Sequence, residues 1–246
     1  MTPLLSLSRV SKTFENGTEA FGPVDIAVRE GEFVSLLGPS GCGKSTALRV
    51  IAGLLAPSAG EVVFPQTRPE IGFVFQEPTL MPWASALANV RLPLDLKGIA
   101  GGQAHARAQR ALERVSLGEF ADAFPRELSG GMKMRVSIAR ALAAAPKLLL
   151  MDEPFAALDE PTRHALNDDL LKLWREDGLT VLFVTHSVFE STFLSTRVVV
   201  MTPRPGRIAA DIALASPAGR DESFRLTSEF SAAAAKVSAA LHAAIA

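Results

Sequence analysis

Apolar residues recur with two different periods along this chain, and each period predicts a different kind of element. Residues 4–14 alternate apolar and polar side chains, which indicates a half-buried strand. A second strand is expected over 24–29, before a turn at Glu30 and Gly31. Further strands are expected where apolar residues gather in short runs, at 33–37, 62–64, 71–75, 148–151 and 181–184. A glycine-rich loop and a helix follow the run at 33–37, so an α/β protein with a mostly parallel sheet is predicted.

A different pattern begins near residue 87. Apolar residues recur there at helical spacing, and helices are predicted over 104–115 and 132–144. We interpret 87–145 as a helical subdomain inserted between two parts of one core, 1–86 and 146–215. A hairpin of 198–202 and 207–214 is expected to close the core. The C-terminal tail, 219–246, is expected to be helical from residue 228. The whole chain, 1–246, is thus predicted to be a single domain.

Composition narrows the classes of function. The formal net charge is −1 over 246 residues, so the chain has no overall basic field, and a primary role in binding nucleic acid is disfavoured. The one cysteine, Cys42, cannot form an internal disulfide, which favours a cytosolic location. Because no run reaches about 18 apolar residues, we expect a soluble protein whose membrane role would come through a partner.

A phosphate-binding loop is the clearest motif. It matches G-x-x-x-x-G-K-[ST] between a buried strand and a helix, and consists of Gly38, Pro39, Ser40, Gly41, Cys42, Gly43, Lys44, Ser45 and Thr46. Its glycines allow successive backbone N–H groups to turn toward phosphate oxygens, and the helix adds the positive end of its dipole. Lys44 is predicted to reach the β- and γ-phosphates of ATP, and the Ser45 hydroxyl to bind Mg²⁺. We interpret Cys42 as a small loop residue rather than a redox site.

Two acids follow the strand predicted at 148–151. Ligands of open α/β sheets bind at the carboxyl ends of the strands, so Asp152 and Glu153 are expected beside the phosphate loop. Asp152 is predicted to hold Mg²⁺ through water, and Glu153 to accept a proton from the attacking water or to polarise it. A solvated turn is the alternative for two adjacent acids, and the phosphate loop argues against it.

The stretch between these motifs carries a third motif. Residues 128–131 read LSGG, and a strand ending in LLLMDEP follows one short helix later. LSGG alone is a weak pattern, but a phosphate loop, LSGG and this strand in that order are specific, and with them the chain closely resembles the ABC transporter ATPase family. The other family elements occur in order, at Phe14 (adenine stacking), Gln76 (Q-loop), 157–159 (D-loop) and His186 (H-loop). The resemblance covers residues 4–208.

This resemblance implies a fold and a reaction. The implied fold is a P-loop NTPase (RecA-like) core with a mostly parallel sheet, an N-terminal antiparallel β subdomain and an inserted helical subdomain. The implied reaction is hydrolysis of ATP with Mg²⁺. Gln76 would sense the metal and the water, His186 would contact the γ-phosphate, and Phe14 would stack on adenine. Core packing is the alternative for Phe14, because strand aromatics are common.

The family pattern also implies two copies of the chain. Ser129, Gly130 and Gly131 open a helix and offer a hydroxyl, N–H groups and a helix dipole. In the family these groups close over the ATP held by a second subunit, so a homodimer is expected on nucleotide binding. An ordinary helix cap is the alternative for Ser129. Two residues depart from the family pattern, Met134 in place of glutamine and Ala156 in place of serine or threonine, and neither removes a group that touches phosphate.

The likeness is greatest to importers of the nitrate, sulfonate and taurine type, through 75–83 and 203–208. Such importers have two membrane permease subunits and a periplasmic or lipoprotein solute-binding protein, and the ATPase lies peripherally at the cytoplasmic face of the bacterial inner membrane. Trp83 is expected either at the groove that receives a permease helix or in packing. Relatives that serve pyrimidine-type vitamin precursors look similar, so the transported solute stays open.

Two other classes of protein share the phosphate loop. A non-transport ABC-type ATPase of DNA repair or translation usually carries paired cassettes or long coiled coils, and this chain has one cassette and no long heptad run. A P-loop kinase or GTPase gives no role to LSGG, Gln76 and His186 together. The sequence therefore favours an importer ATPase, with the non-transport ATPase as the alternative.

Overall fold

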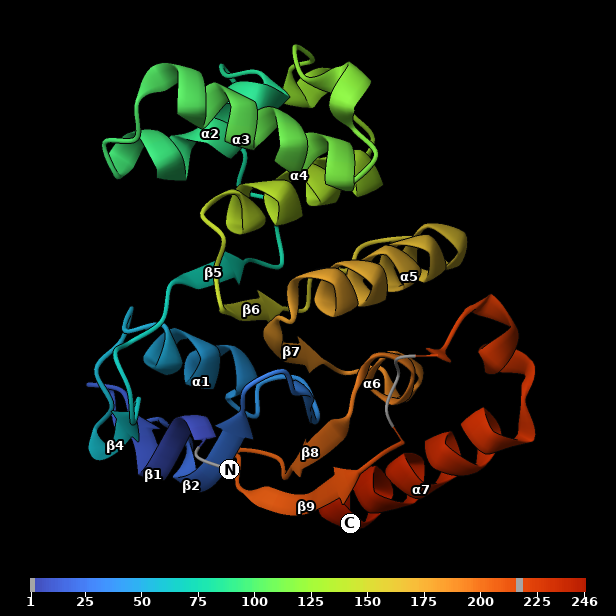
Figure 1. The fold of residues 1–246 in the computed structure, drawn as a ribbon. Coiled ribbons are helices and arrows are strands. Elements are labelled where there is room, and N and C mark those ends of the chain that lie inside the picture. Colours follow the sequence, from blue (N-terminus) through green and yellow to red (C-terminus); the bar gives the residue numbers. More distant parts are fainter. Residues whose placement is uncertain (1–2, 216–218) are drawn as a thin grey trace.

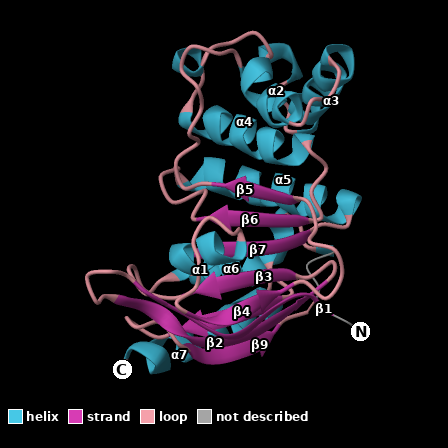
Figure 2. Ribbon diagram, turned by 90° about the vertical axis from the view of Figure 1, so that its left-hand side faces the viewer, coloured by secondary structure: helices cyan, strands magenta, loops and turns pink. Residues whose placement is uncertain are grey.

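The computed structural model of the protein describes residues 3–215 and 219–246. Its central sheet has the strand order β5-β6-β7-β3-β8-β9, and all neighbours are parallel except β8 and β9. The strands are β3 (Phe33–Leu37), β5 (Ile71–Val74), β6 (Leu148–Asp152), β7 (Thr180–Thr185), β8 (Arg197–Met201) and β9 (Ile208–Ala213). The predicted α/β fold with a mostly parallel sheet and a closing hairpin is confirmed (Figure 2).

A separate antiparallel sheet, in the order β2-β1-β4, lies below the central one (Figure 2). Its strands are β1 (Pro3–Thr13), β2 (Glu19–Arg29) and β4 (Ala59–Val63). The prediction that the second strand begins at residue 24 was wrong, because β2 continues through Pro23 back to Glu19. β2 is an edge strand, where a residue without an N–H group is tolerated.

Helices α2, α3 and α4 form a layer beyond the β5 edge of the sheet (Figure 1). They are α2 (Ala86–Leu96), α3 (Gly101–Arg114) and α4 (Gly130–Ala143), with short 3-10 turns η1 (Gly118–Phe120) and η2 (Pro125–Glu127). Their apolar faces pack on one another through buried residues such as Leu94, Leu112 and Met134. The predicted inserted helical subdomain is confirmed, although α3 begins three residues earlier than expected, with two glycines.

Four further helices cover the core: α1 (Lys44–Ile51), α5 (Glu160–Asp177), α6 (Val188–Leu194) and α7 (Ser228–Ile245). The sequence predicted α1 and α7 but assigned no element to α5 or α6. Successive residues of the buried strands face opposite sides: Leu149 and Met151 pack with the helical layer and α5, whereas Leu148 and Leu150 pack with α1 and the antiparallel sheet. This alternation builds two cores on the two faces of one sheet.

The C-terminal tail packs on the core. α7 contacts α6, β8 and β9, and the 3-10 turn η4 (Glu222–Leu226) precedes it. Arg220 fixes the start of this segment, because its buried guanidinium donates to the carbonyl oxygens of Thr192 (2.6 Å), Phe193 (2.7 Å) and Ala215 (2.5 Å). Burial lowers the pKa of Arg220 to about 10. Within the described residues, no helix is long and apolar enough to cross a membrane.

Candidate nucleotide-binding site

The phosphate loop connects the buried end of β3 to the first turn of α1. Gly43 precedes Lys44, the first residue of α1, and has φ 97°. A Cβ atom at position 43 would lie 2.5 Å from the carbonyl oxygen of Ala20, so this position requires glycine both for its conformation and for space. The loop backbone is therefore held against β2, with the α1 N-terminus directed at the same place.

Lys44 supplies the positive charge of this loop and is buried, with only 3% of its surface exposed. Its Nζ donates to the carbonyl oxygens of Gly38 (2.7 Å) and Pro39 (2.9 Å), and lies 3.7 Å from Glu153 Oε1. A buried ammonium needs such partners, since an unpaired charge there would be strongly disfavoured. The side chain is thereby kept at the mouth of the loop.

Ser45 and Asp152 meet across the gap between α1 and β6. The Ser45 hydroxyl donates to Asp152 Oδ1 at 2.5 Å, and Arg49 Nη2 lies 3.9 Å from Asp152 Oδ2. Burial raises the pKa of the Asp152 carboxyl, and the bond from Ser45 and the charge of Arg49 oppose that rise. A hydroxyl and a carboxylate oxygen side by side are hard donors of the kind that Mg²⁺ binds, so these residues fit the predicted metal.

Glu153 and His186 directly follow the neighbouring strands β6 and β7. Asp152 is in register with Val184, and the Glu153 N–H donates to the Val184 carbonyl oxygen at 3.0 Å. Glu153 Oε2 lies 3.0 Å from His186 Nδ1, while its other carboxylate oxygen faces Lys44. Glu153 has φ 45°, a left-handed conformation that costs free energy in a residue with a side chain and is common at functional sites. The structure thus brings Lys44, Glu153 and His186 into one continuous chain of contacts.

A cavity of about 160 Å³ opens beside the loop. Phe14 forms one wall with an exposed ring, which is the position expected of an aromatic that stacks on a base and not of a core residue. The Lys12 ammonium lies 5.9 Å from the centre of that ring. The cavity is lined by Phe14, Thr18, Ala20, Gly41, Gly43, Lys44, Ser45, Thr46, Glu153 and Arg204.

Arg204 is a lining residue that sequence reasoning missed. It lies in the turn between β8 and β9, and its Nε donates to the Gly41 carbonyl oxygen at 3.0 Å. The turn is held tightly, because a Cβ atom at Gly206 would lie 2.0 Å from the Cys42 carbonyl oxygen. In the sequence, the stretch 203–208 shows only a resemblance to importers of the nitrate, sulfonate and taurine type. Its contact with the phosphate loop could not be read from residues more than 150 positions away.

Other predicted residues lie outside this cavity. Gln76 is exposed, two residues beyond β5, at the same strand-end edge as Asp152 but without lining the cavity. Arg140 of α4 ties the segment after Gln76 to the helical layer, since it donates to the carbonyl oxygens of Pro78 (2.8 Å) and Thr79 (2.9 Å). The Q-loop segment is therefore held to α4 by these hydrogen bonds.

The LSGG motif starts α4 at a separate place. Ser129 is exposed and caps the helix by accepting from the Met132 N–H at 3.2 Å. Gly130 is exposed, and a Cβ atom at Gly131 would lie 2.6 Å from Thr162 Cγ2 of α5. These three residues do not line the cavity around Lys44. Within one chain, the N-terminus of α1 therefore lies at the cavity beside the phosphate loop, whereas the N-terminus of α4 lies outside that cavity.

Three remaining positions have simple local explanations. Cys42 is fully buried, and burial raises the pKa of its thiol, which agrees with a packing role in the loop. Met134 is buried in the helical layer, where an apolar side chain gains from burial. Ala156 lies between Glu153 and the D-loop, and its N–H donates to the Glu153 carbonyl oxygen at 3.2 Å.

Comparison with known proteins supports the family resemblance over most of the chain. Residues 21–156 match the family model for ABC transporters. The chain is 48% identical over 196 residues to the taurine import ATP-binding protein of Rhizobium johnstonii, covering 78% of this chain and 75% of that protein. It is 47% identical over 205 residues to an aliphatic sulfonates import ATP-binding protein of Xanthomonas axonopodis, covering 80% and 81%.

Solved structures agree with these sequence matches. A dimeric, post-hydrolysis structure of the ATP-binding cassette MJ0796 with ADP and phosphate superposes with a TM-score of 0.76 at 37% identity, covering 86% of this chain and 99% of that one. The predicted family and enzyme class are confirmed. This chain belongs to the ABC transporter family, as an ATP-binding cassette with the ATPase activity characteristic of that family.

Proposed function

We propose that this chain is the ATP-hydrolysing subunit of an importer for a small solute of the nitrate, sulfonate or taurine kind, or a pyrimidine precursor. The similarity to proteins named for import of taurine and aliphatic sulfonates supports this class of solute. A non-transport ABC-type ATPase is the second candidate. The observation that carries the ATPase part of the proposal is the split arrangement of anion-binding groups, with Lys44 buried beside Glu153 and Ser129 exposed elsewhere, and the similarity to import proteins favours the importer.

Two chains arranged head to tail would combine these groups. The exposed N-terminus of α4 then closes over the triphosphate held by the loop of the other chain, and Ser129 adds its hydroxyl. The γ-phosphate becomes part of the interface, so hydrolysis removes charge-assisted bonds and lets the dimer open. The dimeric structures among the similar cassettes support this assembly.

Within each composite site the side chains have distinct proposed roles. Lys44 leaves the loop carbonyls and binds the β- and γ-phosphates. Glu153 accepts the proton of the attacking water through the oxygen that His186 does not contact, and His186 orients that carboxylate and contacts the γ-phosphate. Gln76 changes position when the γ-phosphate is present, and this change reaches the helical layer through the hydrogen bond between Arg140 of α4 and the Pro78 carbonyl oxygen. The phosphate oxygens are further held by backbone N–H groups of the residues from Gly38 to Thr46.

Mg²⁺ is proposed to bind the Ser45 hydroxyl, with Asp152 and Gln76 as the other protein ligands, directly or through water. When bound there, the metal would neutralise charge that develops on the phosphate oxygens. The direct contact between Ser45 and Asp152 supports this set, because the two oxygens already converge.

We propose that the surface of this chain that contacts the membrane permease lies beside the Q-loop. Trp83 is 77% exposed, which favours a contact site over core packing. A groove of about 290 Å³ lies beside the residues that flank Gln76, and Phe73, Phe75, Leu92, Pro93 and Leu96 are among the residues that line it. Two permease subunits would each place a cytoplasmic helix here, and a periplasmic or lipoprotein solute-binding protein would deliver the solute. This arrangement puts the ATPase at the cytoplasmic face of the membrane.

A transport assay tests the proposed function directly. Cells that lack this chain are expected to lose uptake of one of the proposed solutes, and the wild-type chain is expected to restore it. The Glu153→Gln variant is expected to restore nothing. Unchanged uptake of every proposed solute class in the deletion strain would favour the non-transport ATPase.

Arg204→Ala is expected to raise the KM for ATP about fivefold and to leave kcat nearly unchanged. Its guanidinium lines the cavity between Phe14 and the loop, where it is positioned to contact the ribose or α-phosphate and not the bond that is cleaved. Steady-state kinetics on the purified protein would measure both constants. Arg207→Ala, an exposed arginine three residues later, serves as the control and is expected to change neither. A large fall in kcat for Arg204→Ala would contradict this placement.

A further inference from the structure

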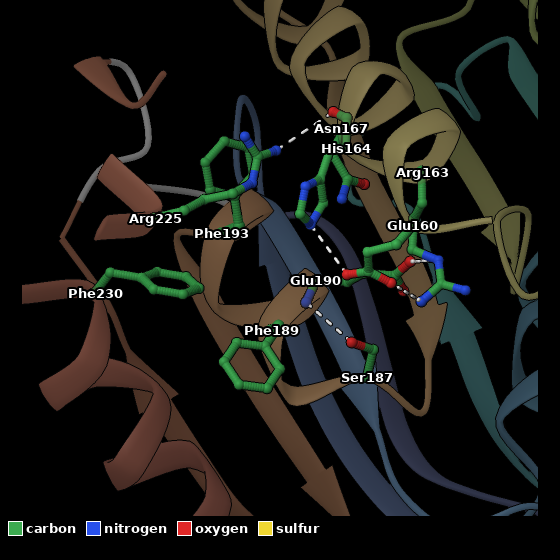
Figure 3. A pocket seen from close by; sticks show the side chains of 10 residues that line it. All are labelled: Glu160, Arg163, His164, Asn167, Ser187, Phe189, Glu190, Phe193, Arg225 and Phe230. Carbon is green, nitrogen blue, oxygen red and sulfur yellow. Dashed lines mark hydrogen bonds and ion pairs between the residues drawn. The ribbon is translucent and has the colours of Figure 1, made fainter. Parts of the chain in front are cut away.

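A second and larger cavity, of about 380 Å³, lies between α5, α6 and the C-terminal tail (Figure 3). None of the proposed catalytic groups lines it. The tail supplies one wall through Arg225 and Phe230. Arg225 is fixed by two bonds to Asp168 (2.9 and 3.3 Å), and its guanidinium carbon lies 3.7 Å from the centre of the Phe193 ring. These contacts join the tail to α5 and α6, so the pocket is formed before any ligand arrives.

The charges around this pocket are already paired with one another. The ion pairs are Arg163–Glu160 (3.1 Å), Arg163–Glu190 (3.6 Å), His164–Glu160 (3.0 Å) and Arg225–Asp168 (2.9 Å). An ionic ligand would have to break one of these pairs and would meet charges of its own sign nearby. The pocket therefore favours a ligand without net charge.

In the part of the chain that the structure describes, two lining residues have a buried side-chain atom without a hydrogen-bond partner: Arg163 at Nε, which lies 3.6 Å from Glu190 Oε1, and Asn167 at Oδ1. Asn167 is 2% exposed and its amide lies in the pocket wall in Figure 3. No hydrogen-bond partner for Oδ1 is found among the described residues. Asn89, also buried, shows the usual arrangement. Its Oδ1 accepts from the Met81 N–H, and its Nδ2 donates to the carbonyl oxygens of Met81 and Ala84. A buried carbonyl oxygen without a partner favours a ligand that brings an N–H donor.

Three aromatic side chains and Ser187 form the rest of the wall. The Phe189 and Phe230 rings lie 6.0 Å apart at an interplanar angle of 34°, and Phe193 meets Phe230 edge to face at 6.5 Å. Phe189 is 67% exposed at the mouth of the pocket, where its face is free to stack. Apolar rings beside one polar amide are the composition of a site for a flat aromatic molecule.

The pocket wall is connected to both loops that the proposed mechanism uses. The Glu190 carboxylate accepts a hydrogen bond from the Thr185 hydroxyl at 2.5 Å, and Thr185 is the residue directly before His186. Arg163 donates through Nη2 to the carbonyl oxygen of Leu158, in the D-loop, at 2.8 Å. A ligand that fixes Glu190 and Arg163 would therefore restrain the H-loop and the D-loop together.

We propose that this pocket is a regulatory site for an uncharged, flat heteroaromatic molecule with an N–H donor, and that its occupancy slows ATP turnover. The N–H would bond to Asn167, and the ring would lie against Phe189 and Phe230. The effect on turnover rests on the proposed role of His186. The binding of the ligand does not, so the two parts can fail separately.

Thermal unfolding tests whether Asn167 is kept for a structural reason. Asn167→Leu, which removes the unpaired amide at similar volume, is expected to unfold at the same temperature as the wild type or higher. The matched variant Asn89→Leu breaks a fully bonded amide and is expected to unfold at a lower temperature. A fall for Asn167→Leu as large as that for Asn89→Leu would overturn the assignment, because it would show that the amide is already satisfied.

Ligand-observed NMR on the full chain tests binding, with indole as the probe. Indole is expected to bind, and 1-methylindole, which lacks the N–H, about tenfold more weakly. Benzoate, an anion, is expected not to compete. Phe189→Ala and Asn167→Leu should each weaken indole binding, while Phe120→Ala, an exposed phenylalanine in the helical layer, should not. Equal binding of indole to all variants, or tighter binding of benzoate, would overturn the proposed site.

ATP turnover tests the coupling. Indole at a concentration that just saturates the wild-type chain is expected to lower its turnover at least twofold and to lower the turnover of Asn167→Leu clearly less, because that variant binds indole more weakly. Binding without any change in turnover would overturn the regulatory part while leaving the site. An equal fall in both proteins would show that indole acts elsewhere.

Discussion

Glu153→Gln is expected to slow ATP turnover by about 10²- to 10⁴-fold, the range that general-base catalysis contributes, while ATP still binds. Glutamine keeps the shape of the side chain but cannot accept the proton of the attacking water. The contact with His186 survives as a neutral hydrogen bond, so the fold around β6 and β7 should be preserved. ATP would then stay bound, and the nucleotide-bound dimer should accumulate.

Single-turnover kinetics and size-exclusion chromatography with ATP would measure these two effects. Glu61→Gln, an exposed acid on β4, is the matched control and should behave like the wild type. Near wild-type turnover in Glu153→Gln would remove this residue as the base. Loss of ATP binding would instead assign Glu153 a structural role as the counter-ion of Lys44.

Lys44→Ala is expected to weaken ATP binding by roughly 10- to 100-fold, the effect of losing charge-assisted hydrogen bonds to phosphate. The buried ammonium lies 3.7 Å from Glu153 and is held by the carbonyl oxygens of Gly38 and Pro39. Its removal also leaves the Glu153 carboxylate without its nearest cation, which adds repulsion toward the triphosphate.

Calorimetric titration with a non-hydrolysable ATP analogue would measure this loss of affinity. Lys147→Ala is the control, because Lys147 is exposed at the start of β6, the end of the sheet away from the loop. An unchanged affinity in Lys44→Ala would contradict the role proposed for the lysine.

The elements of the fold could be predicted where the buried positions are apolar and recur with the period of a strand or a helix. β3, β6 and β7 are nearly continuous apolar runs, and each appears within one or two residues of its predicted bounds. α5 and α6 were not predicted, because polar residues occupy their buried faces: Asn167 in α5 and Glu190 in α6 interrupt the apolar spacing. Those positions line the second cavity, so the failed prediction marks a place where packing is not the only requirement.

The candidate site was predictable wherever a motif has its own chemistry. The loop follows from its motif, Asp152 and Glu153 follow from the strand-end rule, and His186 follows from the family resemblance; the structure places them within contact distance. Arg204 was missed because its contact with Gly41 depends on how the β8–β9 turn folds over the loop, which no local pattern encodes. The distant position of Ser129 is meaningful only with a second copy of the chain.

Mixing two inactive variants tests the head-to-tail site most directly. A Ser129→Arg chain lacks a working LSGG cap but keeps its loop, and a Lys44→Ala chain has the reverse defect. When co-expressed with different affinity tags and purified through both, the heterodimer should hold one intact composite site and regain clear ATPase activity over either variant alone. If heterodimers are shown to form with ATP and remain as inactive as each variant, the two motifs do not share a nucleotide between chains.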